Sequence, residues 1–157
     1  LLIYSVIYRI KVNRLLESID NLEDLLFMNY SLLLSLTAEM FRRKGHLVKI
    51  TDKCGEEGKG LILDNIKFVQ IWRRAIHHDV ECETAIKLAR CMQYNSVYRG
   101  MLITLGDFKQ NTKAFCHKNV IECVNGRQLL SMFREVQKRR ICPDKQYEPT
   151  CTDNKTS

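Results

Sequence analysis

The sequence predicts an α/β protein, with a central mixed β-sheet flanked by helices in a three-layer α/β/α sandwich. Short apolar segments of β-type cluster in the middle of the chain, and segments with helical apolar spacing precede, separate and follow them. Turn-forming residues lie between these segments. With 157 residues, 45% of them hydrophobic and 27% charged, the chain is long and apolar enough to bury one such core.

The chain begins with a predicted helix, residues 1–19, whose first ten residues are mostly apolar. Ten residues are too few to span a bilayer, which needs about 20. Arg9, Lys11 and Arg14 follow, as expected on the cytoplasmic flank of a membrane helix. Two interpretations are open. The segment is the end of a truncated membrane anchor that continues upstream of Leu1, or it is an amphipathic helix packed on the domain.

The next helix is predicted over Tyr30–Lys44, where apolar residues recur at helical spacing, and Gly45 is expected to end it. Three strands are predicted to follow: His46–Thr51, Gly60–Asp64 and Lys67–Trp72. Asp64 and Asn65 provide turn residues for a hairpin between the last two strands.

The second half of the domain alternates helices and strands. Asp79 is a candidate N-cap for a helix that ends near Tyr94. The remaining predicted elements are the strand Arg99–Leu105, the helix Lys109–His117, the strand Asn119–Cys123 and the helix Gly126–Gln137. The sequence thus predicts a domain over residues 20–140, followed by a polar tail, 141–157, that contains both prolines.

Seven cysteines, an odd number without any C-x-x-C pair, indicate neither a zinc ribbon nor a regular disulfide framework. Four of them fall within predicted helices or strands, where cysteine usually packs as a small apolar residue: Cys82, Cys91, Cys116 and Cys123. Cys142 and Cys151 in the tail form the one pair that we expect to be able to bridge. This usage favours a reducing, cytoplasmic compartment, on the cytoplasmic face of a membrane if the anchor exists.

Two other groupings of chemically active residues are weak candidates. His77, His78, Glu81 and Cys82 lie close in sequence, but no second ligand pair is spaced to complete a zinc site with them. Cys116 and its neighbour His117 point about 100° apart on a helix, so they do not form a nucleophile–base pair.

Three motifs in the first half of the chain carry a family resemblance: GHLVKIT at 45–51, GEEGKGLIL at 55–63 and FVQIWRR at 68–74. They are similar to the Mrr-type restriction endonuclease domain, a branch of the PD-(D/E)xK nucleases, whose patterns are G-Y-x-V-x-x-T, G-D-x-G-x-D-L-I and V-Q-x-K-R. The resemblance extends over about residues 20–136 and implies a restriction-endonuclease-like α/β/α fold.

The same resemblance implies that the catalytic residues have been replaced. By position, the family's helix Glu is Leu34, its Asp is Gly60 and its Lys is Trp72, while Gln70 matches. Phosphodiester hydrolysis in such a site needs a bound Mg²⁺ and the nucleophile that the ion generates, and a single neutral amide is a poor ligand for that ion. We therefore expect a catalytically inactive domain without a metal or other cofactor, acting as a DNA-binding or scaffold module. Trp72 is expected to fill the vacated site rather than to stack on a base.

Two alternatives remain. The first is a divergent Mg²⁺-dependent DNA endonuclease that uses Glu56, Glu57 or Asp64, which requires those carboxylates to share a pocket with Gln70. The second is a membrane-tethered protein-interaction domain without a nucleic-acid role.

The net charge of +7 and the pI near 9.1 suit an anionic partner such as DNA or an acidic membrane surface, although the same excess also serves solubility. Arg73 and Arg74 follow the strand of the expected active centre, and Lys109 and Lys113 begin a helix expected at the same side. These four residues are the candidates for phosphate contacts, which carry no sequence specificity.

Overall fold

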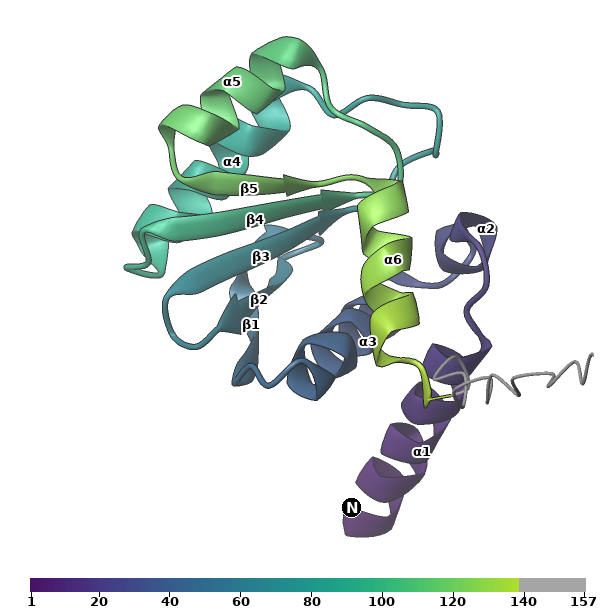
Figure 1. The fold of residues 1–157 in the computed structure, drawn as a ribbon. Helices are drawn as coiled ribbons and strands as arrows, with labels where there is room; N and C mark the ends of the chain where they lie inside the picture. Colours follow the sequence, from purple (N-terminus) through teal and green to yellow (C-terminus); the bar gives the residue numbers. More distant parts are fainter. Residues whose placement is uncertain (139–157) are drawn as a thin grey trace, which may run out of the picture.

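The centre of the computed structural model, which describes residues 1–138, is a five-stranded sheet (Figure 1). In spatial order its strands are β1 (Val48–Glu56), β2 (Lys59–Leu63), β3 (Lys67–Trp72), β4 (Arg99–Thr104) and β5 (Ile121–Val124). β1, β2 and β3 pair antiparallel, whereas β3, β4 and β5 pair parallel. The predicted mixed sheet is therefore confirmed.

Helices cover both faces of this sheet, as the three-layer prediction requires. The described residues form α1 (Leu2–Ser18), α2 (Leu22–Leu26), α3 (Tyr30–Arg43), α4 (Cys82–Tyr94), α5 (Gln110–Lys118) and α6 (Gly126–Val136). α3 and α6 lie on one face, and α4 and α5 lie on the other (Figure 1). Asn29 caps α3 and Asn125 caps α6, each accepting a hydrogen bond from a backbone N–H of the first turn.

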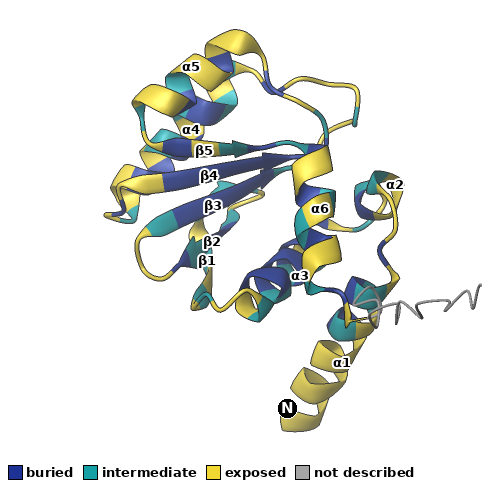
Figure 2. Ribbon diagram, viewed as in Figure 1, coloured by how far each residue is buried: buried dark blue, intermediate teal, exposed yellow. Residues whose placement is uncertain are grey.

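Strand β3 is buried on both faces (Figure 2). Successive side chains of a strand point to opposite faces. Val69 and Ile71 accordingly join the apolar cluster under α3 and α6, and Phe68 joins the cluster under α4 and α5. The sheet therefore separates two apolar cores, and β3 contributes to each of them.

Several element boundaries differ from the prediction by one or two residues, and two of the differences bear on the site. Asp79 does not cap α4, which begins at Cys82, because Val80 is held extended: its N–H donates to the Asp107 carbonyl over 2.8 Å, and it bridges Phe108. β1 continues past Thr51 to Glu56, with an irregular register between these two residues.

The two halves of α1 have different surroundings. Val12 and Leu16 are buried against the domain, as the packed-helix interpretation predicts, whereas the apolar residues of the first turns are exposed. None of the helices in residues 1–138 is long and apolar enough to cross a membrane. An anchor upstream of Leu1 stays a prediction.

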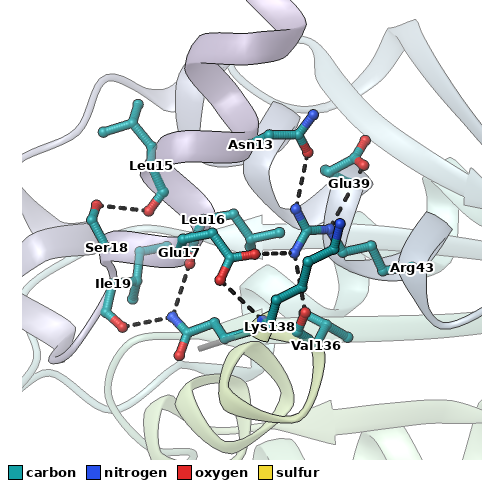
Figure 3. A network of polar contacts seen from close by, with 11 residues as sticks. Asn13, Leu15, Leu16, Glu17, Ser18, Ile19, Glu39, Arg43, Val136 and Lys138 are labelled. Carbon is teal, nitrogen blue, oxygen red and sulfur yellow. Dashed lines mark hydrogen bonds and ion pairs between the residues drawn. The ribbon is translucent and has the colours of Figure 1, made fainter. Parts of the chain in front are cut away.

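A half-buried arginine fixes the packed half of α1 to two other helices (Figure 3). The Arg43 guanidinium on α3 donates to Glu17 Oε1 over 2.6 Å and to Asn13 Oδ1 over 3.1 Å, both on α1. It also donates to the Val136 carbonyl at the end of α6 over 3.1 Å. Charged hydrogen bonds of this kind are stronger than neutral ones, and a planar guanidinium can serve several acceptors at once.

One cysteine prediction is wrong. Cys54 on β1 and Cys91 on α4 form a disulfide, with their Cα atoms 5.6 Å apart, whereas Cys91 was expected to be a free apolar residue. No spacing pattern signals a pair 37 residues apart, because only the fold brings β1 and α4 together. The disulfide also removes the cysteine-based argument for a reducing compartment. The expected pair, Cys142 and Cys151, lies outside the described residues.

We expect reduction of the Cys54–Cys91 disulfide to lower the free energy of unfolding by about 2–4 kcal/mol, because the bond closes a 37-residue separation in the unfolded chain. Urea denaturation with and without dithiothreitol, repeated on a Cys54→Ala/Cys91→Ala variant, measures the change. Cys82→Ala, which removes a free thiol, is the matched control. A midpoint that reduction leaves unmoved would contradict the expectation.

Candidate functional site

Four positions correspond to the catalytic residues of the family that the sequence resembles. Three of them lie together on one face of the sheet. The register pairs Leu61 with Val69, which places Gly60 of β2 opposite Gln70 of β3. Trp72 lies two residues further along β3 and therefore on the same face as Gln70. Leu34 does not join them, since it is 1% exposed within the apolar cluster beneath the other face.

The space beside Gly60 is already filled. A Cβ atom at this position would stand 2.5 Å from Phe68 Cζ and 3.2 Å from the Val69 carbonyl oxygen. Phe68 is fully buried, so its ring cannot swing aside without disturbing the core under α4 and α5. The ring occupies the place that an acidic side chain at position 60 would need.

Gln70 carries an unusual buried group. Its side chain is 3% exposed, and its Oε1 atom has no hydrogen-bond partner among residues 1–138. A buried acceptor without a donor costs about 1–3 kcal/mol.

Gln70 and Trp72 line a cleft of about 390 Å³. Its walls come from the ends of β1 and β3, the loop that follows β3, and the first turns of α4. The other lining residues are Glu56, Arg74, His78, Asp79, Glu81, Glu83, Thr84 and Lys87. The lining thus contains four carboxylates and two cations, so the cleft is acidic although the chain as a whole is basic.

Ion pairs balance only part of this acidity. Glu81 accepts a hydrogen bond of 2.9 Å from Lys109 Nζ, which holds the pKa of the Glu81 carboxyl below its usual range. Glu83 pairs with Lys87 over 3.2 Å. Glu56 and Asp79 form no ion pair with any residue in the described part of the chain.

The four predicted DNA contacts do not form one basic face on this cleft. Arg74 lines it, whereas Arg73 lies near the Tyr30 hydroxyl on the side of α3. Burial and the nearby Glu56 raise the pKa of Tyr30, and Arg73 opposes that rise. Lys109 pairs with Glu81 at the rim, and Lys113 lies 3.9 Å from Asp107. Their role in DNA binding stays a prediction.

Of the three carboxylates that the alternative endonuclease would use, only Glu56 shares a pocket with Gln70. Glu57 is an exposed turn residue with a φ of 52°. Asp64 lies at the opposite end of β2, where it accepts hydrogen bonds of 2.9 Å from the Leu47 N–H and 2.7 Å from His46 Nδ1. Within residues 1–138, no three His, Cys, Asp or Glu side chains are grouped to hold a metal ion.

Sequence reasoning missed the acidic wall of the cleft. Asp79, Glu81 and Glu83 lie in and after the loop that leaves the carboxyl end of β3, which pairs parallel with β4. Ligands of open α/β sheets often bind at such strand ends, and that rule would have drawn attention to this loop. His78 and Glu81 line the cleft, but His77 lines a different pocket, so the weak zinc candidate does not come together in residues 1–138.

A sequence profile of the Mrr_cat family, described as restriction endonuclease, matches residues 27–133. The chain belongs to this family. Among solved structures, the Mrr-family domain is similar to one described as MspJI restriction endonuclease in complex with a 27-mer oligonucleotide, with 14% identity and a TM-score of 0.46. The match covers 85% of this chain and 31% of that chain. No curated protein sequence matches the chain.

We expect Gly60→Ala to lower the free energy of unfolding by about 1–3 kcal/mol, because the added methyl group overpacks the Phe68 ring. In a Phe68→Leu background, the same substitution should cost less, with a coupling of about 0.5–3 kcal/mol. Urea denaturation of the two single variants and the double variant completes this double-mutant cycle. If the two substitutions have additive effects on the free energy of unfolding, the Phe68 ring does not fill the space beside Gly60.

The pKa of the Asp64 carboxyl is lowered by its hydrogen bond to His46 and, next in size, by that from the Leu47 N–H. Because the folded-state pKa of Asp64 lies below its unfolded value, the hydrogen bonds of the ionised carboxylate stabilise the fold at neutral pH. This stabilisation is lost as the pH falls through the lowered pKa. Asp64→Asn should therefore destabilise the domain at pH 7 but much less in strong acid, as measured by thermal unfolding. Asp52→Asn controls for loss of a surface carboxylate, and an equal effect at both pH values would contradict the expectation.

Proposed function

We propose that this Mrr-family domain is a catalytically inactive restriction-endonuclease-like module that binds a partner without hydrolysing DNA. The packing at Gly60 carries the proposal, because the Phe68 ring leaves no space for the acidic side chain that the family uses there. Trp72, in place of the family's lysine, supports it, since indole has no charge to offer the attacking water or a phosphate. The domain retains the fold around the site but lacks the family's catalytic side chains.

DNA is the partner class that the family and the net charge of +7 favour. Phosphates are disfavoured in the acidic cleft, so we place their contacts on basic side chains outside it, with Arg73, Lys109 and Lys113 as candidates. Contacts of this kind bind nucleic acid without reading its sequence.

A divergent metal-dependent endonuclease is the second candidate, and the position of Glu56 beside Gln70 in the cleft favours it. These residues do not fit the ion well. Mg²⁺ requires about six oxygen ligands in octahedral geometry and is usually held through one or two carboxylates together with substrate phosphates. Although four carboxylates line the cleft, no three His, Cys, Asp or Glu side chains within residues 1–138 are grouped to hold an ion, and the acid-rich surrounding leaves no place for the phosphate.

The test combines cleavage and binding on the same purified chain. We expect no nicking of supercoiled plasmid with Mg²⁺ or Mn²⁺. Labelled duplex DNA should nevertheless bind, with an affinity that falls steeply as salt rises. Arg73→Ala should lower the slope of log affinity against log salt by about 1, whereas Lys118→Ala, at the far end of α5, should not.

Reproducible nicking that disappears in Glu56→Gln would refute inactivity and establish the metal-dependent alternative. Absence of DNA binding at low salt would instead remove DNA as the partner and leave a protein scaffold.

A further inference from the structure

Two free cysteines lie against one another between α5 and the strand that follows it. Cys116 is in the last turn of α5, and Cys123 is on β5, an edge strand of the sheet. Alternate residues of a strand face the same side, so Cys123 points with Ile121 toward the core under α4 and α5, to which Cys116 belongs. The two thiols are hydrogen-bonded to each other. The fold therefore holds a pair of unoxidised thiols in contact.

The two thiols of this pair differ in exposure and in charge state. Cys116 is 1% exposed, whereas Cys123 is half-buried at the edge of the sheet. The hydrogen bond from the Cys116 thiol lowers the pKa of Cys123, and the Lys113 ammonium lowers it further against the opposing effect of burial. The same hydrogen bond, together with burial, raises the pKa of Cys116. The thiolate therefore forms at the accessible Cys123, and Cys116 stays protonated beneath it.

This arrangement has the chemistry of an oxidisable cysteine with a resolving partner. The thiolate and not the thiol is the nucleophile, and oxidation is selective for accessible thiolates of lowered pKa. A second thiol in contact can trap the first oxidation product as a disulfide. Cys82, at the start of α4, is near enough to Cys116 to interact with it electrostatically, so it is the competing partner that a test must separate.

We propose that Cys123 and Cys116 form a reversible redox pair, in which a peroxide oxidises Cys123 and Cys116 then closes a disulfide that joins α5 to β5. The inference goes beyond the proposed function, because neither DNA binding nor DNA hydrolysis enters it.

The reaction balances in two steps with one peroxide. The Cys123 thiolate attacks one peroxide oxygen and the O–O bond breaks, which gives a sulfenic acid on Cys123 and a hydroxide that takes up a proton to leave as water. The Cys116 sulfur then attacks the Cys123 sulfur, the S–O bond breaks, and the oxygen leaves as water with the Cys116 proton. The two sulfurs lose two electrons in total, and the peroxide accepts both. A small dithiol reverses the bond by thiol–disulfide exchange.

Tryptic peptides can report the bond directly. Cleavage after Lys113, Lys118 and Arg127 places Cys116 in peptide 114–118 and Cys123 in peptide 119–127, each with a single cysteine. The purified full chain is treated with equimolar hydrogen peroxide, alkylated with N-ethylmaleimide, digested and analysed by mass spectrometry. We expect the two peptides to appear joined, lighter by two hydrogen atoms than their separate thiol forms, and to separate again after dithiothreitol.

Variants assign the two roles. Cys116→Ser removes the resolving thiol, so the sulfenic acid on Cys123 should persist and be labelled by dimedone. Cys123→Ser should lose the joined peptides and leave peptide 114–118 without a dimedone label, because the buried Cys116 does not react. Cys82→Ser removes another half-buried free thiol and is the matched control, which should form the joined peptides like the unmodified protein. Thermal unfolding verifies that each variant is folded.

The proposal is overturned if peroxide leaves peptides 114–118 and 119–127 separate, or if Cys82 is found joined to either of them. Dimedone labelling of Cys123 that is no stronger in Cys116→Ser than in the unmodified protein would also overturn it. If a variant does not fold, the joined peptides of the unmodified chain decide. DNA binding and cleavage leave these outcomes unaffected, so the two proposals fail separately.

Discussion

The burial of β3 on both faces is the constraint on which the rest of the structure depends. Because the pleat alternates side chains, Val69 and Ile71 must serve one core while Phe68, Gln70 and Trp72 serve the other side. A one-residue shift of the strand would bury Gln70 among the leucines of α3 and move Val69 and Ile71 to the side of α4. The same alternation that builds two cores therefore places the amide and the indole together at the strand's end.

The cleft needs more than β3, and its walls are fixed from outside the strand. The bridge between Val80 and Phe108 holds the loop before α4 extended and sets where that helix begins. The Cys54–Cys91 disulfide joins β1, which ends at Glu56, to α4, which carries Glu83 and Lys87. The disulfide and the backbone bridge thus hold the walls of the cleft in place, and the polar side chains that line it do not.

The charge of this protein is unevenly placed. A net charge of +7 describes the chain, yet the groove that Gln70 and Trp72 line has an excess of carboxylates. The proposed loss of nuclease chemistry and the acidity of the groove are consistent with each other, because a site that does not handle phosphate is free to be negative.

Periodicity and turn chemistry in the sequence determined the sandwich, the mixed sheet, the apolar face of α3 and the ends of β3, because these features depend on neighbours within a few residues. The family motifs likewise marked Gly60, Gln70 and Trp72, which the strand register then brought together. Sequence did not reveal that Phe68 fills the place beside Gly60, that Cys54 meets Cys91, or that Leu34 lies beneath the opposite face. It also did not reveal that Glu56 shares a cleft with Glu81 and Glu83 whereas Asp64 binds His46. Those facts depend on contacts between segments far apart in the chain, which only the packing of the helices on the sheet decides.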